Sequence, residues 1–183
     1  MVDEHGIPTG QIIERTRAHE LGTLHRTSHV WLVRIMGGRL QVLLQKRSSS
    51  KDSYPGCYDI SSAGHIPAGA GFVDSALREL KEELGICAAP GQLLYCGQRR
   101  FCFKEVFYGK QFYDNQVSNI YALWMDCEPE AFILQKEEVS EVCWFDFDDC
   151  MEKVRLNMIP NCIFLDEFQM VKDKAESTMN SLK

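Results

Sequence analysis

The sequence lacks the features that mark membrane-spanning and secreted proteins. Its apolar runs are short: one of the longest, Ile120–Met125, has far fewer than the ~20 residues that a helix needs to cross a bilayer. The N-terminal stretch carries acidic residues where a signal peptide carries lysine or arginine. We therefore expect a cytoplasmic protein that does not associate with membranes.

Close cysteine pairs are also missing. None of the eight cysteines belongs to a Cys-x-x-Cys pair, and most lie in apolar stretches such as Glu141–Phe145. Disulfide frameworks and structural zinc sites usually show close pairs of this kind. We expect reduced, largely buried thiols in a reducing compartment, and no zinc site.

A run rich in lysine and arginine is the third absence. The chain has 20 Lys+Arg against 26 Asp+Glu, a net charge of −6, so it is poorly suited to grip a nucleic acid polymer by its phosphates. Without internal repeats or linkers, the 183 residues, 45% of them hydrophobic, indicate one domain over residues 1–183. An anionic substrate would need a cation to offset the repulsion.

What is present indicates strands and helices in irregular alternation. Apolar and β-branched runs predict strands at 28–35, 39–45, 58–63, 93–103, 116–126 and 139–147. Helical spacing of apolar residues predicts helices at 72–84, 148–156 and, as a C-terminal helical extension, at about 161–178. This order favours an α/β fold with a mixed sheet over a doubly wound parallel one. The last helix could cover the sheet or pair with a second subunit in a homodimer.

Three acidic residues, Glu79, Glu82 and Glu83, stand at i, i+3 and i+4 near the end of the 72–84 helix. Their carboxylates share one face, repel one another and meet the negative end of the helix dipole. A divalent cation such as Mg²⁺ or Mn²⁺ would relieve this cost, because such ions prefer oxygen ligands. The alternative is an ordinary solvated face with intrahelical ion pairs.

A longer pattern decides between these readings. It runs from residue 64 to residue 86 and is carried by Gly64, Arg78, Glu79, Leu80, Glu82, Glu83, Gly85 and Ile86. These residues match the Nudix box, G-x5-E-x7-R-E-U-x-E-E-x-G-U with U apolar, at every specified place but one, where Ala70 replaces the first glutamate. The sequence therefore resembles the Nudix superfamily.

The resemblance implies a Nudix α/β/α sandwich in which residues 64–86 form a loop, a helix and a second loop. It implies that Glu82 and Glu83 bind the metal, that Glu79 is a ligand or the base that activates water, and that Arg78 holds a glutamate in place. Many members carry a further glutamate before the last core strand, and Glu137 or Glu138 could serve here as base or ligand, or simply belong to a solvated loop.

Outside the box, the chain resembles the isopentenyl-diphosphate isomerase-like branch of that superfamily over most of residues 2–146. The resemblance is carried by Val2–Gly10, Leu24-His25-Arg26 and Ser53-Tyr54-Pro55-Gly56. In the isomerases a cysteine and a glutamate move the proton, but Ala63 and Gln116 occupy their places here. Neither side chain can exchange a proton in this way, which favours hydrolysis over isomerisation.

The same resemblance points to two further groups of polar residues. Arg47 and Lys51 match a basic loop that binds the diphosphate, a role that suits a guanidinium and a mobile ammonium; simple solubility is the alternative. His19, His25 and His65, with Asp114, fall near the metal ligands of the isomerases. Since dispersed histidines more often have separate roles, we expect a structural role for these, with a vestigial second metal site as the alternative, and a structural role for His29 within its strand.

Aromatic residues gather between 101 and 113, where they could stack a nucleobase or, more conventionally, fill the core and cap a hairpin. From all these features we expect a Mg²⁺- or Mn²⁺-dependent pyrophosphohydrolase that acts on a small-molecule diphosphate such as a nucleoside diphosphate or its derivative. The alternatives are an isopentenyl-diphosphate isomerase and a non-catalytic Nudix-fold binding module, to which Ala70 gives slight support.

Overall fold

The computed structural model describes residues 1–181 and contains one mixed β-sheet. Its strands are β1 (His25–Met36), β2 (Arg39–Arg47), β3 (Tyr58–Asp59), β4 (Ser62–His65), β5 (Leu94–Phe107), β6 (Lys110–Trp124) and β7 (Val139–Asp146). The central path is β3-β2-β1-β6-β5, while β4 pairs with β1 and β7 pairs with β2. The β1–β6 pair is parallel and the other pairs are antiparallel, which confirms the expected mixed sheet.

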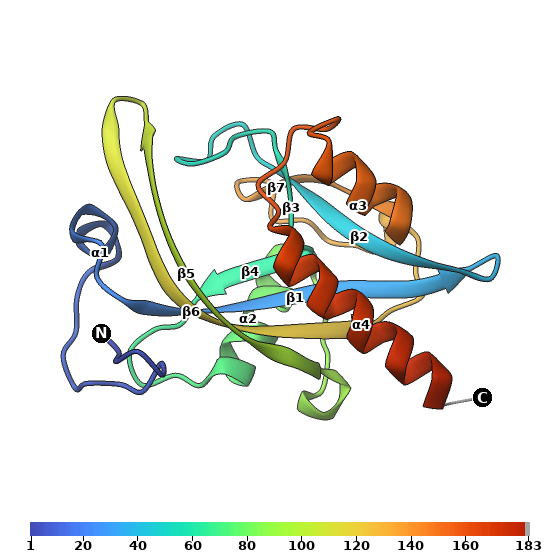
Figure 1. The fold of residues 1–183 in the computed structure, drawn as a ribbon, viewed down its shortest axis with the longest axis horizontal. Coiled ribbons are helices and arrows are strands. Elements are labelled where there is room, and N and C mark those ends of the chain that lie inside the picture. Colours follow the sequence, from blue (N-terminus) through green and yellow to red (C-terminus); the bar gives the residue numbers. More distant parts are fainter. Residues whose placement is uncertain (182–183) are drawn as a thin grey trace.

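Helices cover both faces of this sheet, as expected (Figure 1). They are α1 (Arg15–Leu21), α2 (Phe72–Leu84), α3 (Phe147–Arg155) and α4 (Leu165–Ser181), with short 3-10 turns at Pro90–Gln92 and Pro129–Ala131. The β5–β6 hairpin is long and extends well beyond the rest of the sheet. No helix within residues 1–181 combines the length and the apolar character needed to cross a bilayer.

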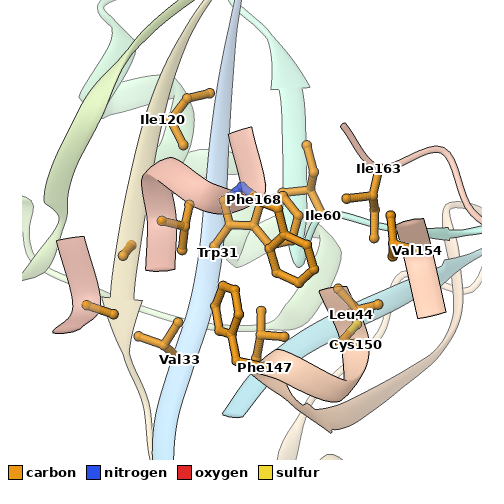
Figure 2. Packing of buried hydrophobic residues seen from close by; sticks show 14 residues of the cluster. Trp31, Val33, Leu44, Ile60, Ile120, Phe147, Cys150, Val154, Ile163 and Phe168 are labelled. Atoms are coloured by element: carbon orange, nitrogen blue, oxygen red, sulfur yellow. The ribbon is translucent and has the colours of Figure 1, made fainter. Parts of the chain in front are cut away.

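Alternation along β1 builds a core on each face. Val30 and Leu32 pack with the apolar side of α2, whereas Trp31 and Val33 pack with α3 and α4. On the second face the Trp31 ring stacks on Phe168, with centroids 4.9 Å apart (Figure 2). Because both faces of β1 are buried, this strand is the fixed centre from which the site is built.

Three expectations need correction. The last helix begins at Leu165, not at residue 161, because Asn161 bridges to Tyr58 and the Cys162 amide donates to the Tyr58 carbonyl, which keeps this segment extended. The helix α1 was not expected. The eight cysteines, all within the described residues, are free as expected, but only Cys150 is fully buried, and Cys87 and Cys102 are exposed.

Candidate active site

The helix α2 carries two of the three acidic residues toward β4. It ends at Gly85, whose left-handed φ of 73° lets the backbone close the helix. Ala76, Leu80 and Leu84 form its buried face. Next to that face, the Glu79 carboxyl group packs against Gly64 so closely that a Cβ at this position would collide with it. The glycine of the box is therefore required by the approach of a carboxylate to the backbone.

Glu83 is the more deeply buried of the pair, with 6% of its surface exposed. One carboxyl oxygen accepts a hydrogen bond from the Ala63 amide at 3.3 Å. Burial raises the pKa of Glu83 to about 8, and the charge of Glu79 adds to the rise against the opposing hydrogen bond from the Ala63 amide. A buried carboxyl group whose charged form is disfavoured in this way is suited to bind a cation.

Arg78 fixes the first of these carboxylates. Its Nη2 donates to Glu79 Oε1 at 2.5 Å and to the His65 carbonyl at 3.2 Å. Its Nε lies 3.8 Å from Glu82, whose side chain is more than half exposed. The structure therefore brings Glu79 and Glu83 together at β4 and leaves Glu82 on the solvent side of α2.

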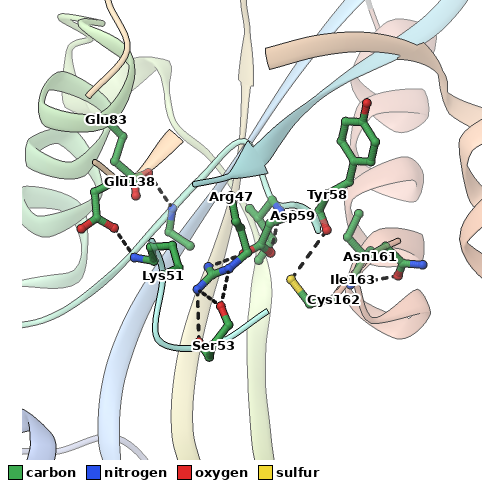
Figure 3. A network of polar contacts seen from close by, with 12 residues as sticks. Arg47, Lys51, Ser53, Tyr58, Asp59, Glu83, Glu138, Asn161, Cys162 and Ile163 are labelled. Atoms are coloured by element: carbon green, nitrogen blue, oxygen red, sulfur yellow. Dashed lines mark hydrogen bonds and ion pairs between the residues drawn. The ribbon is translucent and has the colours of Figure 1, made fainter. Parts of the chain in front are cut away.

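The segment between β2 and β3, residues 48–57, contributes the basic side of the site, with Lys51 directed at Glu138 (Figure 3). The Arg47 guanidinium donates to the Ser53 carbonyl, to the Ser53 hydroxyl and, at 2.9 Å, to Asp59. The Lys51 ammonium forms an ion pair with Glu138, and its charge opposes the rise in the pKa of Glu83. Arg47 thus braces the segment that presents Lys51 to the acidic residues of the site.

The three histidines expected to have separate roles instead form one cluster. Ligand nitrogens of His19, His25 and His65 all lie within 4.8 Å of one another. Nε2 of His19 is 3.0 Å from Nε2 of His65, while Nδ1 of His19 faces the Tyr113 carbonyl and Nδ1 of His25 faces the Thr23 carbonyl. The α1 helix, absent from the sequence-based expectation, is what places His19 here.

Two buried polar atoms beside this cluster are unsatisfied. His25 Nε2 and Asp114 Oδ1 lie 3.6 Å apart, and neither has a hydrogen-bond partner among the described residues. Burial lowers the pKa of both His19 and His65, which favours their neutral form. Neutral imidazoles with free nitrogens are suited to bind a transition metal. The expectation of separate roles assumed that these histidines lie apart, and their clustering shows that this assumption was wrong.

A cavity lies beside the cluster, on the α3–α4 face of the sheet. Residues of the β5–β6 hairpin, β1, β4 and segment 48–57 line it, among them Lys51, Tyr54, Gly64, His65, Phe101 and Phe103. Ala63 and Gln116, at the places of the isomerase acid and base, also face it, and the amide of Gln116 donates to Asp114 at 3.3 Å. Neither of these two side chains supplies a titratable group to the cavity.

At the mouth of the cavity, the Tyr54 ring meets Phe107 edge to face, with centroids 4.8 Å apart. The tip of the β5–β6 hairpin therefore touches segment 48–57. The aromatic residues of the hairpin divide between this contact and the cavity wall, where Phe101, Phe103 and Phe112 lie. They do not fill the main cores, contrary to the conventional reading of that stretch.

Sequence reasoning missed several charged residues of the same cavity, among them Glu167 and Arg99. Glu167 on α4 is 1% exposed and accepts hydrogen bonds from His29 Nδ1 and Trp31 Nε1, each at 2.9 Å. A signal for Glu167 exists, because helical spacing puts it on the face of Phe168 and Val171. An acid on an apolar face needs a buried partner, and His29 and Trp31, alternate residues of a buried strand, supply it.

Comparison with known proteins agrees with this geometry. Residues 25–162 match the NUDIX domain. An uncharacterised Nudix hydrolase of Clostridium acetobutylicum is 38% identical over 135 residues, which cover 74% of this chain and 63% of that protein. Nudix hydrolase 3 of Arabidopsis thaliana is 38% identical over 160 residues, covering 81% of this chain and 20% of that protein. The chain thus spans less than two thirds of the length of either relative.

Solved structures show the same fold. The crystal structure of DR0079 from Deinococcus radiodurans has a TM-score of 0.68 at 19% identity and covers 93% of this chain and 96% of that one. The NUDIX domain of Shewanella oneidensis NrtR, complexed with ADP ribose, has a TM-score of 0.57 at 17% identity, covering 91% and 99%. At these identities the likeness establishes the fold, and the chemistry must be argued from the residues.

Proposed function

Because the chain belongs to the NUDIX domain family, we propose that it is a divalent-metal-dependent hydrolase that cleaves the pyrophosphate bond of a nucleoside diphosphate or a nucleoside-diphosphate derivative. One observation carries this proposal: Glu83 is buried beside Glu79, and the charge of the Lys51 ammonium reaches it and opposes the rise in its pKa. The names of the relatives, Nudix hydrolases, support the reaction class.

A divalent cation suits this group of acidic residues. The raised pKa of Glu83 means that the nearby positive charge is too little to offset the burial of this carboxyl group beside Glu79. Carboxylate oxygens are the donors that Mg²⁺ and Mn²⁺ prefer, and Glu79, Glu82 and Glu83 are the residues that would hold the ion. When bound, it would neutralise the diphosphate and lower the pKa of a bound water.

The remaining roles fall to the chain's own side chains. We propose that Arg78 orients Glu79 through their hydrogen bond and that Glu138 accepts the proton of the attacking water. Lys51 would exchange its contact with Glu138 for the diphosphate, which would free the Glu138 carboxylate for this task. Arg47 lines the same cavity and would contact the diphosphate while bracing segment 48–57.

A direct test is release of phosphate or nucleotide from a panel of diphosphates with Mg²⁺ and Mn²⁺. We expect Glu83→Gln to lower the rate about a hundredfold or more, and Glu130→Gln, a change in an exposed glutamate away from the proposed site residues, to leave it unaltered. Lys51→Gln is expected to raise KM more than it lowers kcat. Metal-independent release, or equal rates in wild type and Glu83→Gln, would refute the assignment.

The isomerase-like branch remains part of the proposal through its second metal site. The convergence of His19, His25 and His65 beside the unsatisfied Asp114 oxygen fits a transition-metal ion. Titration with Co²⁺ should give a visible absorption band that His65→Gln abolishes and that His5→Gln, a change in an exposed histidine, retains. A band that survives His65→Gln would remove this site. Isomerase activity itself is opposed by Ala63 and Gln116.

A further inference from the structure

One wall of the cavity is built partly by residues outside the matched NUDIX segment. Phe164 and Glu167 follow residue 162, the last of that segment, and both line the cavity with Arg99 of β5. This wall is therefore where the present chain can differ from other family members in what it binds.

Arg99 is held there with part of its guanidinium free. Its central carbon lies 4.7 Å from the ring centroid of Phe101 and 4.6 Å from that of Phe164, so phenyl rings pack on the group. Its Nε donates to Asp166 at 2.7 Å. Neither Nη1 nor Nη2 forms a hydrogen bond with any residue in 1–181, although the side chain is only 10% exposed. A nine-tenths buried arginine thus offers its outer edge to the cavity.

The surrounding charges decide what this edge can bind. Asp166 is hydrogen-bonded to Arg99, and Glu167 Oε2 lies 3.8 Å from Nη1. These carboxylates offset the positive charge and would repel a carboxylate or a second phosphate. A neutral acceptor meets no such repulsion, and a planar one can stack on the aromatic residues that line the cavity. A hydrocarbon chain would leave the buried N–H groups unpaired, which is costly.

The cross-strand register gives the distance between the backbone of Arg99 and that of β4. Arg99 pairs with Ser118, Ser118 with Thr27, and Thr27 with His65 next to Gly64. Three strand spacings separate the Arg99 backbone from β4, or about 14 Å. The Arg99 side chain shortens this gap, because its Nη1 lies 3.8 Å from Glu167, which also bonds His29 of β1, the strand next to β4. The organic part of the substrate would fill the remaining interval.

We propose that Arg99 is the specificity residue for the organic part of the substrate, and that it selects a neutral, planar ring with two adjacent hydrogen-bond acceptors. The 6-oxopurine base of guanosine or inosine diphosphate presents such a pair, O6 and N7, to an arginine edge. Adenine presents a donor in place of O6 and is rejected. The inference rests on the proposed function for the diphosphate end and adds the identity of the base.

The test compares kcat/KM for GDP, IDP and ADP in the wild type and in Arg99→Lys. We expect the wild type to favour GDP and IDP over ADP by about 5- to 150-fold, and Arg99→Lys to reduce the ratio to about twofold or less. The matched control is Arg100→Lys, since Arg100 bonds Glu4 and Asn115 instead. A preference for ADP, or a ratio that Arg99→Lys does not change, would overturn the proposal.

Binding of GMP and AMP in the absence of metal separates this proposal from the hydrolytic one. If no diphosphate is cleaved, the hydrolytic proposal fails, yet GMP should still bind more tightly than AMP and shift the guanidinium NMR signals of Arg99. The same NMR measurement on the wild type decides the matter if Arg99→Lys does not fold. Equal binding of the two nucleotides, with no shift at Arg99, would refute the role of Arg99.

Discussion

Two buried glutamates on opposite faces of the sheet have opposite surroundings. Glu167 is 1% exposed and receives hydrogen bonds from His29 and Trp31, with Arg99 nearby. Glu83 is 6% exposed, lies beside Glu79, and has a pKa raised by burial to about 8. The charge of Glu167 is thus stabilised by neighbouring donors of the protein, whereas Glu83 lacks enough positive charge around it and would be stabilised by a cation. Burial alone therefore does not identify a site; an unmet charge requirement does.

The largest loss of stability should follow from breaking the buried pair of Glu167 and His29. Glu167→Gln leaves His29 without its counter-charge in a buried position, and we expect a loss of about 3 kcal/mol in the free energy of unfolding. Urea denaturation measures this loss. Glu176→Gln, a change in an exposed residue of the same helix, should stay within about 0.5 kcal/mol. Equal stabilities of the two variants would show that the buried pair contributes nothing.

Next comes the approach of Glu79 to the backbone. Gly64→Ala inserts a methyl group where the Glu79 carboxyl group lies, so this carboxylate must move. We expect metal-dependent hydrolysis to fall ten- to hundredfold, because misplacement by about an ångström is costly in catalysis. Gly91→Ala is the control, since a Cβ at this glycine meets no atom within 4 Å. Full activity of Gly64→Ala would place the reacting groups elsewhere.

A smaller change, in stability, should follow when Glu83 is neutralised. Glu83→Gln removes a carboxyl group that burial already disfavours in its charged form, so the metal-free protein should change in stability by about 1 kcal/mol or less. Thermal unfolding without metal is the measurement, with Glu82→Gln as the exposed partner. A loss as large as that of Glu167→Gln would mean that both glutamates are structural.

The smallest effect concerns pH. Burial alone would lower the pKa of His29, but the charge and hydrogen bond of Glu167, together with more distant Asp59 and Asp114, outweigh burial and raise the pKa above 6.5. Because the folded value exceeds the unfolded one, the contribution is fully present below about pH 6.5 and is lost as pH rises through the folded pKa. Denaturation at several pH values should show this fall in the wild type and not in Glu167→Gln. A parallel fall in both would assign it to another group.

Much of the fold followed from local patterns. The periodicity of residues 72–84 predicted the bounds of α2, and the apolar runs at 28–35 and 39–45 predicted β1 and β2. The start of α4 did not follow, because the bridge between Asn161 and Tyr58 joins residues about a hundred positions apart. Such tertiary pairing leaves no mark on local spacing.

The site shows the same division. The spacing of Glu79, Glu82 and Glu83 predicted one shared face, but only Glu79 and Glu83 come together at β4, while Glu82 is more than half exposed. The resemblance assigned Lys51 to a loop that binds the diphosphate, which stays a prediction. The histidine cluster required α1, which has little apolar periodicity to reveal it. Arg99 could not be distinguished from Arg100 in sequence, since alternate residues of a strand face opposite sides and only the packing of Phe164 tells which side is enclosed.

The central claim is that Glu83 and its neighbours bind a divalent cation that the diphosphate then joins. The most direct measurement is Mn²⁺ binding by electron paramagnetic resonance in a His65→Gln background, where the histidine cluster cannot compete. We predict that this protein binds Mn²⁺ and that adding Glu83→Gln weakens the affinity at least tenfold. Mn²⁺ binding of equal affinity with and without Glu83→Gln would contradict the account.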